Sequence, residues 1–227
     1  MCFNDDIQGT GAVALAGIFS ALQITEENIQ NQRIGFLGAG SATVGIANMI
    51  VASMVKNGLT TEQARKQLWF VDSRGFVTTG RSEALAEHKI LYARYEKDLK
   101  TLLEVVRKVK PTVMLGLSIQ SNAFTEEVIR EMEKGVERPI IFALSNPTDK
   151  SEYNPQQADK WTEGSVLYAS GSPYAPVVCG DREFKLGQGN NMYISPCVGL
   201  GATMSESRTV TDSMFYAAAK ALKSSSQ

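Results

Sequence analysis

Short apolar runs that alternate with helical patterns are the feature of this sequence that most constrains its fold. Each run is followed by a turn and then by a segment whose apolar residues recur at helical spacing. Strands that are apolar along their whole length are typical of a parallel sheet covered on both faces. We therefore predict an α/β fold with a doubly wound, mostly parallel sheet and helices on both faces. Its strands are expected at residues 33–37, 68–71, 112–116, 139–144 and 166–169.

Helical periodicity fills the segments around these strands. The earliest helix, expected at residues 9–22, consists of small and apolar residues, so we expect it to be buried and closely packed. No repeat, low-complexity tract or long linker interrupts the pattern, and we treat residues 1–227 as one domain. Further helices are expected at residues 44–56, 99–108, 128–134 and 212–223.

Composition excludes several classes of protein. The chain has 23 Lys and Arg against 24 Asp and Glu, which disfavours a function that needs a strong basic field for nucleic acid. The single histidine, His88, excludes a metal centre that needs two. The cysteines, Cys2, Cys179 and Cys197, are odd in number and far apart, which fits a reducing compartment rather than a disulfide framework. No apolar run approaches the ~20 residues of a membrane helix, and we expect no membrane partner and no signal peptide.

A glycine-rich turn follows the first strand and opens the next helix. Gly38 and Gly40 are its first two glycines. The standard dinucleotide fingerprint has a third glycine at the position of Thr43, whereas the next glycine here is Gly45, two positions later. Such a turn lets the backbone approach a pyrophosphate, and the helix N-terminus supplies N–H groups. This is typical of a Rossmann-like coenzyme site, although a tight turn without a ligand is the alternative.

Asp72 ends the second strand and has two interpretations. A carboxylate there accepts hydrogen bonds from the adenosine ribose hydroxyls, which predicts NAD. Ser73 and Arg74 follow it directly, and an arginine can offset the carboxylate and bind a phosphate. The residues alone leave this choice open, and a solvated turn is a further alternative for Arg74.

Paired carboxylates at Asp5 and Asp6 form a second candidate group. Carboxylate oxygens are ligands that Mg²⁺ and Mn²⁺ prefer. Adjacent residues usually point apart, so at most one of the two would bind a metal directly. A turn or a helix cap is the structural alternative for the pair.

Asparagines form the third candidate group. Asn146 follows an apolar strand, at the edge where parallel sheets bind ligands, and Asn190 and Asn191 follow a Gly-Gln-Gly segment. A carboxamide can hydrogen-bond a substrate carboxylate or a nicotinamide amide without adding charge. Turn formation explains the same residues equally well.

Taken together, these segments resemble the malic enzymes, specifically their NAD(P)-binding domain. Five blocks match the family in order along essentially the whole chain. The first is similar to the family's metal-site signature and the second to its coenzyme turn. The blocks are Phe3–Thr10, Phe36–Ala42, Ser145–Thr148, Ala169–Pro173 and Gly187–Ile194.

The resemblance implies oxidative decarboxylation of L-malate to pyruvate and CO2, with reduction of NAD(P)+ and a requirement for Mn²⁺ or Mg²⁺. It implies that Asp6 binds the metal directly and that Asp5 lies next to the metal site without binding the metal itself. It also implies that Asn146 and Asn190 contact the substrate. The coenzyme residues that it implies are Thr10, Gly38, Ala39, Gly40, Ser41, Asp72, Asn146 and Asn191.

The family's catalytic tyrosine and lysine, and two further metal carboxylates, belong to a domain upstream of the Asp5-Asp6 block. We therefore assign no catalytic residue in this chain, and neither Tyr92 nor Tyr193 is given that role. The chain is expected to be an isolated coenzyme-binding domain, from a full-length enzyme that is a homo-oligomer. We expect a cytoplasmic location, with a mitochondrion or other organelle as the alternative.

The same resemblance bears on the choice of coenzyme. NADP-preferring relatives carry serine, a basic residue and lysine at the positions of Ser73, Arg74 and Lys89. We therefore predict NADP, with NAD as the alternative.

Two alternative functions fit the same sequence. A malolactic enzyme domain, which converts L-malate to lactate, would share this sequence pattern. A nucleotide-binding or dimerising fragment without turnover is the alternative from another class.

Overall fold

The computed structural model describes residues 2–81, 85–179, 182–184 and 186–224. Its internal contacts divide the chain into two compact units, each built from segments that are separate in the sequence. The helical unit comprises residues 1–31, 41–64 and 189–227, and the sheet unit comprises residues 32–40 and 65–188.

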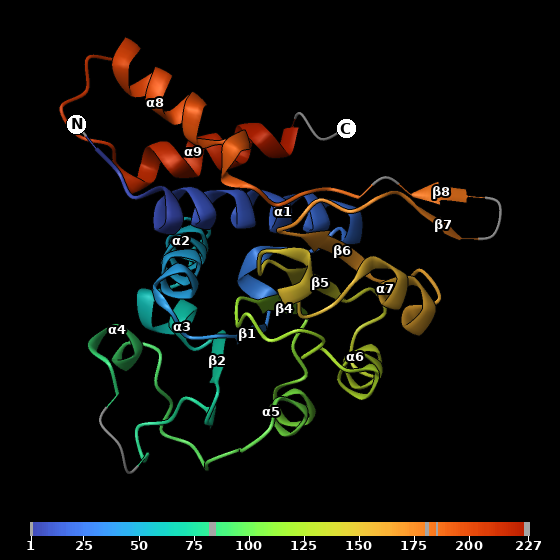
Figure 1. Ribbon diagram of the computed structural model, residues 1–227. Helices are drawn as coiled ribbons and strands as arrows, with labels where there is room; N and C mark the ends of the chain where they lie inside the picture. Colours follow the sequence, from blue (N-terminus) through green and yellow to red (C-terminus); the bar gives the residue numbers. More distant parts are fainter. Residues whose placement is uncertain (1, 82–84, 180–181, 185, 225–227) are drawn as a thin grey trace. The chain divides into compact units, whose positions relative to one another are not determined.

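A six-stranded sheet forms the centre of the sheet unit (Figure 1). Its strand order is β3-β2-β1-β4-β5-β6, and all neighbours are parallel except the antiparallel pair β2–β3. The predicted α/β class with a mostly parallel sheet is therefore confirmed. The strands are β1 (Ile34–Leu37), β2 (Leu68–Asp72), β3 (Gly75–Phe76), β4 (Val113–Gly116), β5 (Ile140–Ala143) and β6 (Leu167–Ser170).

The strand order reverses between β1 and β4. From β1 the chain continues to β2 on one side, and β4 lies on the other side with β5 and β6 beyond it. Loops that leave neighbouring strands in opposite directions open a crevice at their carboxyl ends, where α/β sheets bind ligands. The carboxyl ends of β1, β2, β4 and β5 are called the carboxyl edge below.

Three amphipathic helices of the sheet unit bury their apolar faces against the sheet. Val106 of α5, Ile129 of α6 and Ala158 of α7 belong to one buried cluster together with strand residues such as Met114 and Ile141. These three helices are α5 (Leu102–Val109), α6 (Glu126–Glu133) and α7 (Pro155–Thr162). The unit also contains α4 (Glu87–Ile90), a 3-10 turn η3 (Thr148–Lys150) and a hairpin of β7 (Val177–Cys179) and β8 (Arg182–Phe184).

The helical unit is organised around α1, which packs against α2 and α9. Gly11 of α1 lies so close to α2 that an added Cβ would be only 3.1 Å from the Gly45 carbonyl oxygen, a tighter contact than is usual for a side chain. The expected close packing of this small-residue helix is thus confirmed. The unit contains η1 (Asp5–Gly9), α1 (Thr10–Thr25), η2 (Ile29–Asn31), α2 (Ser41–Lys56), α3 (Thr61–Arg65), η4 (Asn191–Tyr193), α8 (Ser195–Met204) and α9 (Asp212–Ser224).

The expectation that no apolar segment approaches the length of a membrane helix needs correction. The continuous helical stretch Asp5–Thr25 has 21 residues and contains an 18-residue window with a mean hydropathy of 1.4, so it is long and apolar enough to cross a membrane. It reaches this length because the π-helical turn η1 runs directly into α1. More than half of that window is buried inside the protein, as is usual for a core helix, which passes the same test of length and composition.

Local capping interactions explain why some helices begin at other residues than the spacing of apolar residues predicts. The helix expected from residue 99 begins at Leu102, because Thr101 and Glu104 form a reciprocal capping box. Asn154 and Gln157 form the same box at the start of α7, a helix that the apolar pattern did not predict. The antiparallel strand β3 was also not predicted, since two residues are too short to show a period.

Candidate functional site

The phosphate turn, defined as Gly38-Ala39-Gly40, lies at the point where the strand order reverses. The N–H of Gly38 donates to Val71 O of β2 (2.8 Å), and the Leu117 N–H donates to Leu37 O (2.7 Å). Gly38 has φ +113°, and an added Cβ would lie only 2.4 Å from Leu117 O. Only glycine adopts this conformation in this space, so the first glycine of the turn is required by the backbone itself.

Gly40 differs from Gly38, because an added Cβ would meet no heavy atom within 4 Å. The open space beside Gly40 provides room for a group to approach the backbone closely, as a pyrophosphate does. Ala39 is buried, and its carbonyl oxygen lies 3.2 Å from His88 Nε2 of α4. Ser41 continues the chain as the first residue of α2. The geometry of the turn therefore fits a dinucleotide.

Asp72 is the centre of a charged cluster at the end of β2. Arg81 Nη1 donates to both carboxylate oxygens at 2.9 Å, and Lys89 Nζ donates to Oδ2 at 3.0 Å. The Arg74 N–H donates to Oδ1 at 3.0 Å. Asp72 and Lys89 were both predicted as coenzyme residues, and the structure brings them together; Arg81 was not predicted. Ser73 and Arg74 are exposed on the adjoining turn.

The surroundings of Asp72 act on its acidity in opposite directions. Burial by itself raises the pKa of Asp72. The hydrogen bonds from the Arg74 N–H, Lys89 and Arg81 outweigh burial, and the pKa lies below the ordinary value of 3.8. The carboxylate is therefore ionised, and it stabilises the fold in its charged form.

A pH dependence of stability follows from this lowered pKa. Because the folded-state pKa lies below the unfolded one, the contribution of Asp72 is complete above the ordinary pKa and is lost as the pH falls through the folded value. We expect Asp72→Asn to lower the urea midpoint at pH 6, and the gap from wild type to close as the pH falls below about 4. The control is the exposed Asp149→Asn. A gap that stays constant from pH 6 to pH 2.5, a range set by these ordinary carboxyl values, would contradict the assignment.

Asn146 lies at the carboxyl edge beyond β5, where the sequence predicted a ligand contact. Its Oδ1 accepts a hydrogen bond from the buried Ser172 hydroxyl at 2.6 Å, while Asn146 itself is exposed. The peptide bond between Asn146 and Pro147 is cis. Since Oδ1 is engaged, a ligand at this edge would meet the two N–H donors of the carboxamide.

In the helical unit, the structure brings together Asp5 and Asn191. The Asn191 carboxamide and the Ser195 hydroxyl each donate to one oxygen of Asp5. Gly9 makes this possible, because a Cβ there would lie 2.4 Å from Asp5 Oδ1. Asp6 is exposed beside this group.

The carboxylates of this chain do not form a complete metal site. Within the described ranges, no group of three or more His, Cys, Asp or Glu side chains is placed to hold a metal ion. Asp5 is occupied by side-chain donors, and Asp6 offers a single carboxylate, whereas Mg²⁺ needs an octahedral set of oxygens. The residues present therefore fit at most one ligand position.

Other predicted residues have local roles. The side chain of Asn190 accepts the N–H of Met192 and caps η4, and Thr10 is the first residue of α1. Sequence reasoning missed Arg81, Ser172 and Ser195. Ser172 lies within one of the matched sequence blocks. Nothing in the sequence around Arg81 indicated that its side chain would hydrogen-bond Asp72.

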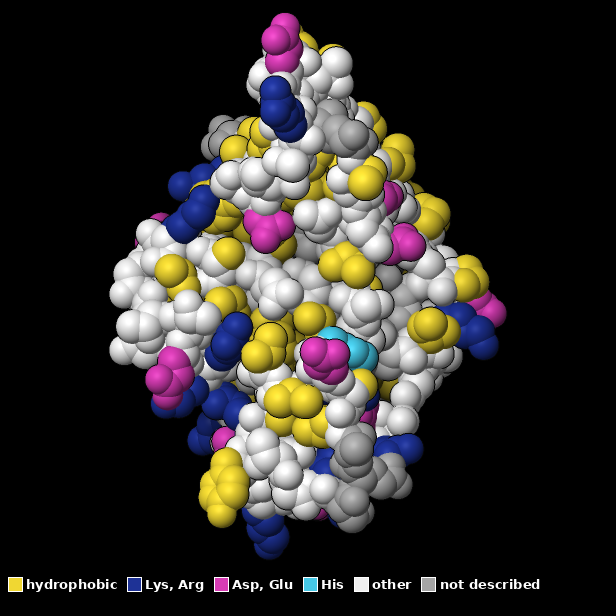
Figure 2. All heavy atoms as spheres, turned by 90° about the vertical axis from the view of Figure 1, so that its left-hand side faces the viewer, with side chains coloured by type: hydrophobic (Ala, Val, Ile, Leu, Met, Phe, Trp, Pro, Cys, Tyr) yellow, Lys and Arg dark blue, Asp and Glu magenta, His cyan; other side chains and the backbone are white. Residues whose placement is uncertain are grey.

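Charged side chains are scattered over the face in Figure 2, where Lys and Arg are interspersed with acidic and hydrophobic groups. The histidine, His88, is exposed. Two cysteines, Cys2 and Cys197, carry exposed free thiols. The side chain of Cys179 lies outside the described part of the chain.

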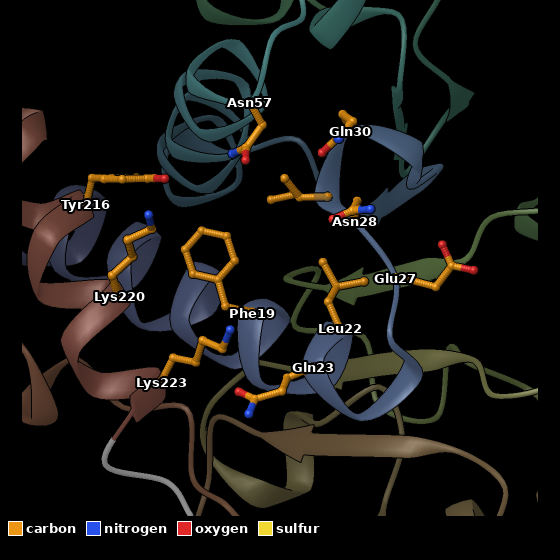
Figure 3. A pocket seen from close by; sticks show the side chains of 11 residues that line it. Phe19, Leu22, Gln23, Glu27, Asn28, Gln30, Asn57, Tyr216, Lys220 and Lys223 are labelled. Atoms are coloured by element: carbon orange, nitrogen blue, oxygen red, sulfur yellow. The ribbon is translucent and has the colours of Figure 1, made fainter.

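A cavity of about 210 Å³ lies within the helical unit (Figure 3). Phe19 and Leu22 of α1 form part of its wall, and Lys220 and Lys223 enter from α9. Glu27 lies across from these lysines, so the lining carries both signs of charge. None of its eleven lining residues was predicted as a site residue, and the coenzyme residues are not part of it.

The sheet topology, the phosphate turn and the charged cluster after β2 define a dinucleotide-binding α/β domain. Comparison with known proteins makes this more specific. Residues 7–227 match the family described as "Malic enzyme, NAD binding domain". The chain belongs to the malic enzyme family.

Relatives with curated names include enzymes of both coenzyme types. The chain is 51% identical over 226 residues to the NADP-dependent malic enzyme of Dictyostelium discoideum, covering 99% of this chain and 42% of the relative. It is 43% identical to the NAD-dependent malic enzyme of Proteus mirabilis, covering 97% and 40%. The chain thus spans about two fifths of the length of these relatives.

Solved structures agree with this assignment. Malic enzyme from Entamoeba histolytica matches with a TM-score of 0.72 at 27% identity, covering 96% of this chain and 41% of that one. NAD-dependent malic enzyme from Thermotoga maritima matches with a TM-score of 0.74 at 26% identity, covering 96% and 51%.

Proposed function

We propose that this chain binds NADP+ at the carboxyl edge and is the coenzyme-binding part of an enzyme that oxidatively decarboxylates L-malate to pyruvate and CO2. The observation that carries the coenzyme choice is the pairing of Asp72 with two cations, Arg81 and Lys89. The reaction rests on the family assignment.

The charge balance after β2 favours a phosphate over a hydroxyl. One carboxylate faces two cationic side chains, and the adjoining turn carries the guanidinium of Arg74, so the cluster has an excess of positive charge. A ribose 2′-phosphate complements such a cluster. In NAD, the ribose hydroxyl would have to compete for the oxygens of Asp72 with Arg81 and Lys89.

Residues of the sheet unit would hold and orient the two ends of the coenzyme. NADP+ supplies the hydride acceptor when bound. Gly38 sets the shape of the phosphate turn, and the open space at Gly40 admits the pyrophosphate. Asn146, held by Ser172, presents its N–H donors at the other end of the edge. In the helical unit, Asp6 would contribute one carboxylate to a Mn²⁺ or Mg²⁺ site whose other ligands lie outside this chain.

A direct assay tests this proposal. We expect the purified 227-residue chain to bind NADP+ more tightly than NAD+ in calorimetric titrations. In the presence of L-malate and Mn²⁺ we expect no reduction of NADP+, because the family's acid, base and remaining metal carboxylates belong to the upstream domain. Malate-dependent growth of NADPH absorbance by this chain would contradict the division of roles. Failure to bind either coenzyme would contradict the binding proposal itself.

A further inference from the structure

We propose that Glu152 is a positioning residue that fixes the spacing between the phosphate turn after β1 and Asn146 after β5. The inference rests on the coenzyme site proposed above. It concerns how a single buried carboxylate holds the loops of three neighbouring strands in one arrangement.

Glu152 lies between η3 and α7 and is fully buried. Three donors converge on its Oε1. They are the Ser118 N–H at 2.7 Å, the Ser118 hydroxyl at 2.9 Å and the Ser145 hydroxyl at 2.5 Å. Ser118 follows β4 and Ser145 follows β5, so one oxygen atom joins the ends of two adjacent strands.

From Ser118 the connection extends to the phosphate turn. Gly38 packs so closely on this loop that an added Cβ would lie 2.4 Å from Leu117 O and 3.2 Å from Ser118 N. Gly116, at the end of β4, makes room for the carboxylate, because a Cβ there would lie 2.8 Å from Glu152 Oε2. Displacing Ser118 would therefore displace the surface on which Gly38 rests.

From Ser145 the connection extends to Asn146. The Ser145 hydroxyl donates to Glu152 and accepts the Ile119 N–H at 3.0 Å, which ties the β4 and β5 loops a second time. Asn146 is the next residue, and its carboxamide oxygen accepts a hydrogen bond from Ser172, which follows β6. The orientation of the ligand-facing amide thus depends on the position of Ser145.

The second oxygen of Glu152 argues against a purely stabilising role. Oε2 is buried and has no hydrogen-bond partner among the described residues. A buried oxygen without a partner costs free energy, and so does taking a charge out of water, so these costs offset part of the stability that the three hydrogen bonds contribute. The carboxylate is well suited to hold three donors at one point, because bonds to a charged acceptor are shorter and stronger than bonds to an amide.

The experiment compares two ligands on Glu152→Gln in the 227-residue chain. NADP+ spans the carboxyl edge, whereas adenosine 2′-monophosphate, which lacks the 5′-phosphate, reaches only the cluster at Asp72. We expect Glu152→Gln to raise the Kd for NADP+ by about fivefold or more and that for adenosine 2′-monophosphate by less than about twofold. Retained binding of the monophosphate shows that the variant is folded.

A matched control uses the same substitution at the other end of the sheet. Glu133 accepts the Ser165 hydroxyl at 3.1 Å ahead of β6, and Glu133→Gln should leave both affinities unchanged. Ser145→Ala, which removes one donor, should reproduce the selective loss for NADP+. Equal weakening of both ligands by Glu152→Gln, or no change in either affinity, would each overturn the proposal. Wild-type chain that binds neither ligand would instead refute the proposed function on which it rests.

Discussion

Gly38→Ala is expected to destabilise the sheet unit and to abolish coenzyme binding. Alanine at φ +113° costs about 1–2 kcal/mol in backbone strain. Its Cβ would also lie 2.4 Å from Leu117 O, a backbone atom that no rotamer change can move aside, and overpacking of this kind costs about 1–3 kcal/mol. The sum is a large share of the stability of a typical domain. Urea unfolding and NADP+ titration measure the two effects.

Gly40→Ala separates folding from binding in the same turn. Its Cβ would enter open space, so the urea midpoint should stay within about 0.5–1 kcal/mol of wild type in free-energy terms. Coenzyme affinity should nevertheless fall, because the methyl group occupies the space that the pyrophosphate needs. A folded Gly40→Ala chain that binds NADP+ normally would show that the phosphate lies elsewhere. Wild-type stability of Gly38→Ala would show that the turn relaxes more readily than its contacts indicate.

Lys89→Gln is expected to weaken NADP+ by about tenfold or more, which corresponds to 1.4 kcal/mol or more. Lys89 is partly buried and lies 3.0 Å from Asp72, so its charge acts in a site only partly screened by water. The Kd for NAD+ should change little, because NAD+ has no phosphate at this position. Paired calorimetric titrations of both coenzymes measure the difference.

The control for Lys89 is Lys97→Gln, an exposed lysine of the same unit, which should leave both affinities unchanged. Equal losses for NAD+ and NADP+ on Lys89→Gln would mean that Lys89 supports the fold around Asp72 rather than the phosphate. No loss for either coenzyme would show that Lys89 does not contact the coenzyme.

Much of the sheet could be predicted from the sequence because three of its central strands are buried along their whole length. β1, β4 and β5 are four-residue apolar runs in which every residue is buried, and such runs are visible without any alignment. The helix expected from residue 128 begins at Glu126, because the Thr125 hydroxyl accepts the Val128 N–H and caps it. Helices and strands that depend on a capping residue or on one short buried run could therefore be predicted from the sequence.

The site could be predicted only where its residues lie next to a recognisable turn or strand end. Asp72 and Asn146 follow strands, and Gly38 opens a fingerprint, so their positions were inferred from topology. The partners of these residues come from other loops, with no pattern in the sequence to mark them, as Arg81 does for Asp72 and Ser172 does for Asn146. Glu152 was missed because a lone glutamate in a loop has no periodicity, and only the folded chain shows that it is buried.

The helical unit is built from segments that are far apart in the sequence, and this affects how the chain folds during synthesis. The helix α1 packs on α2, which follows it closely, but also on α9, which starts about 190 residues later in the sequence. At typical translation speeds of about 5–20 residues per second, α9 is made roughly 10–40 s after α1. Throughout that interval the α9-facing side of a long apolar helix has no native partner to cover it. During that interval the nascent chain exposes apolar surface that the finished fold covers, and such surface promotes aggregation.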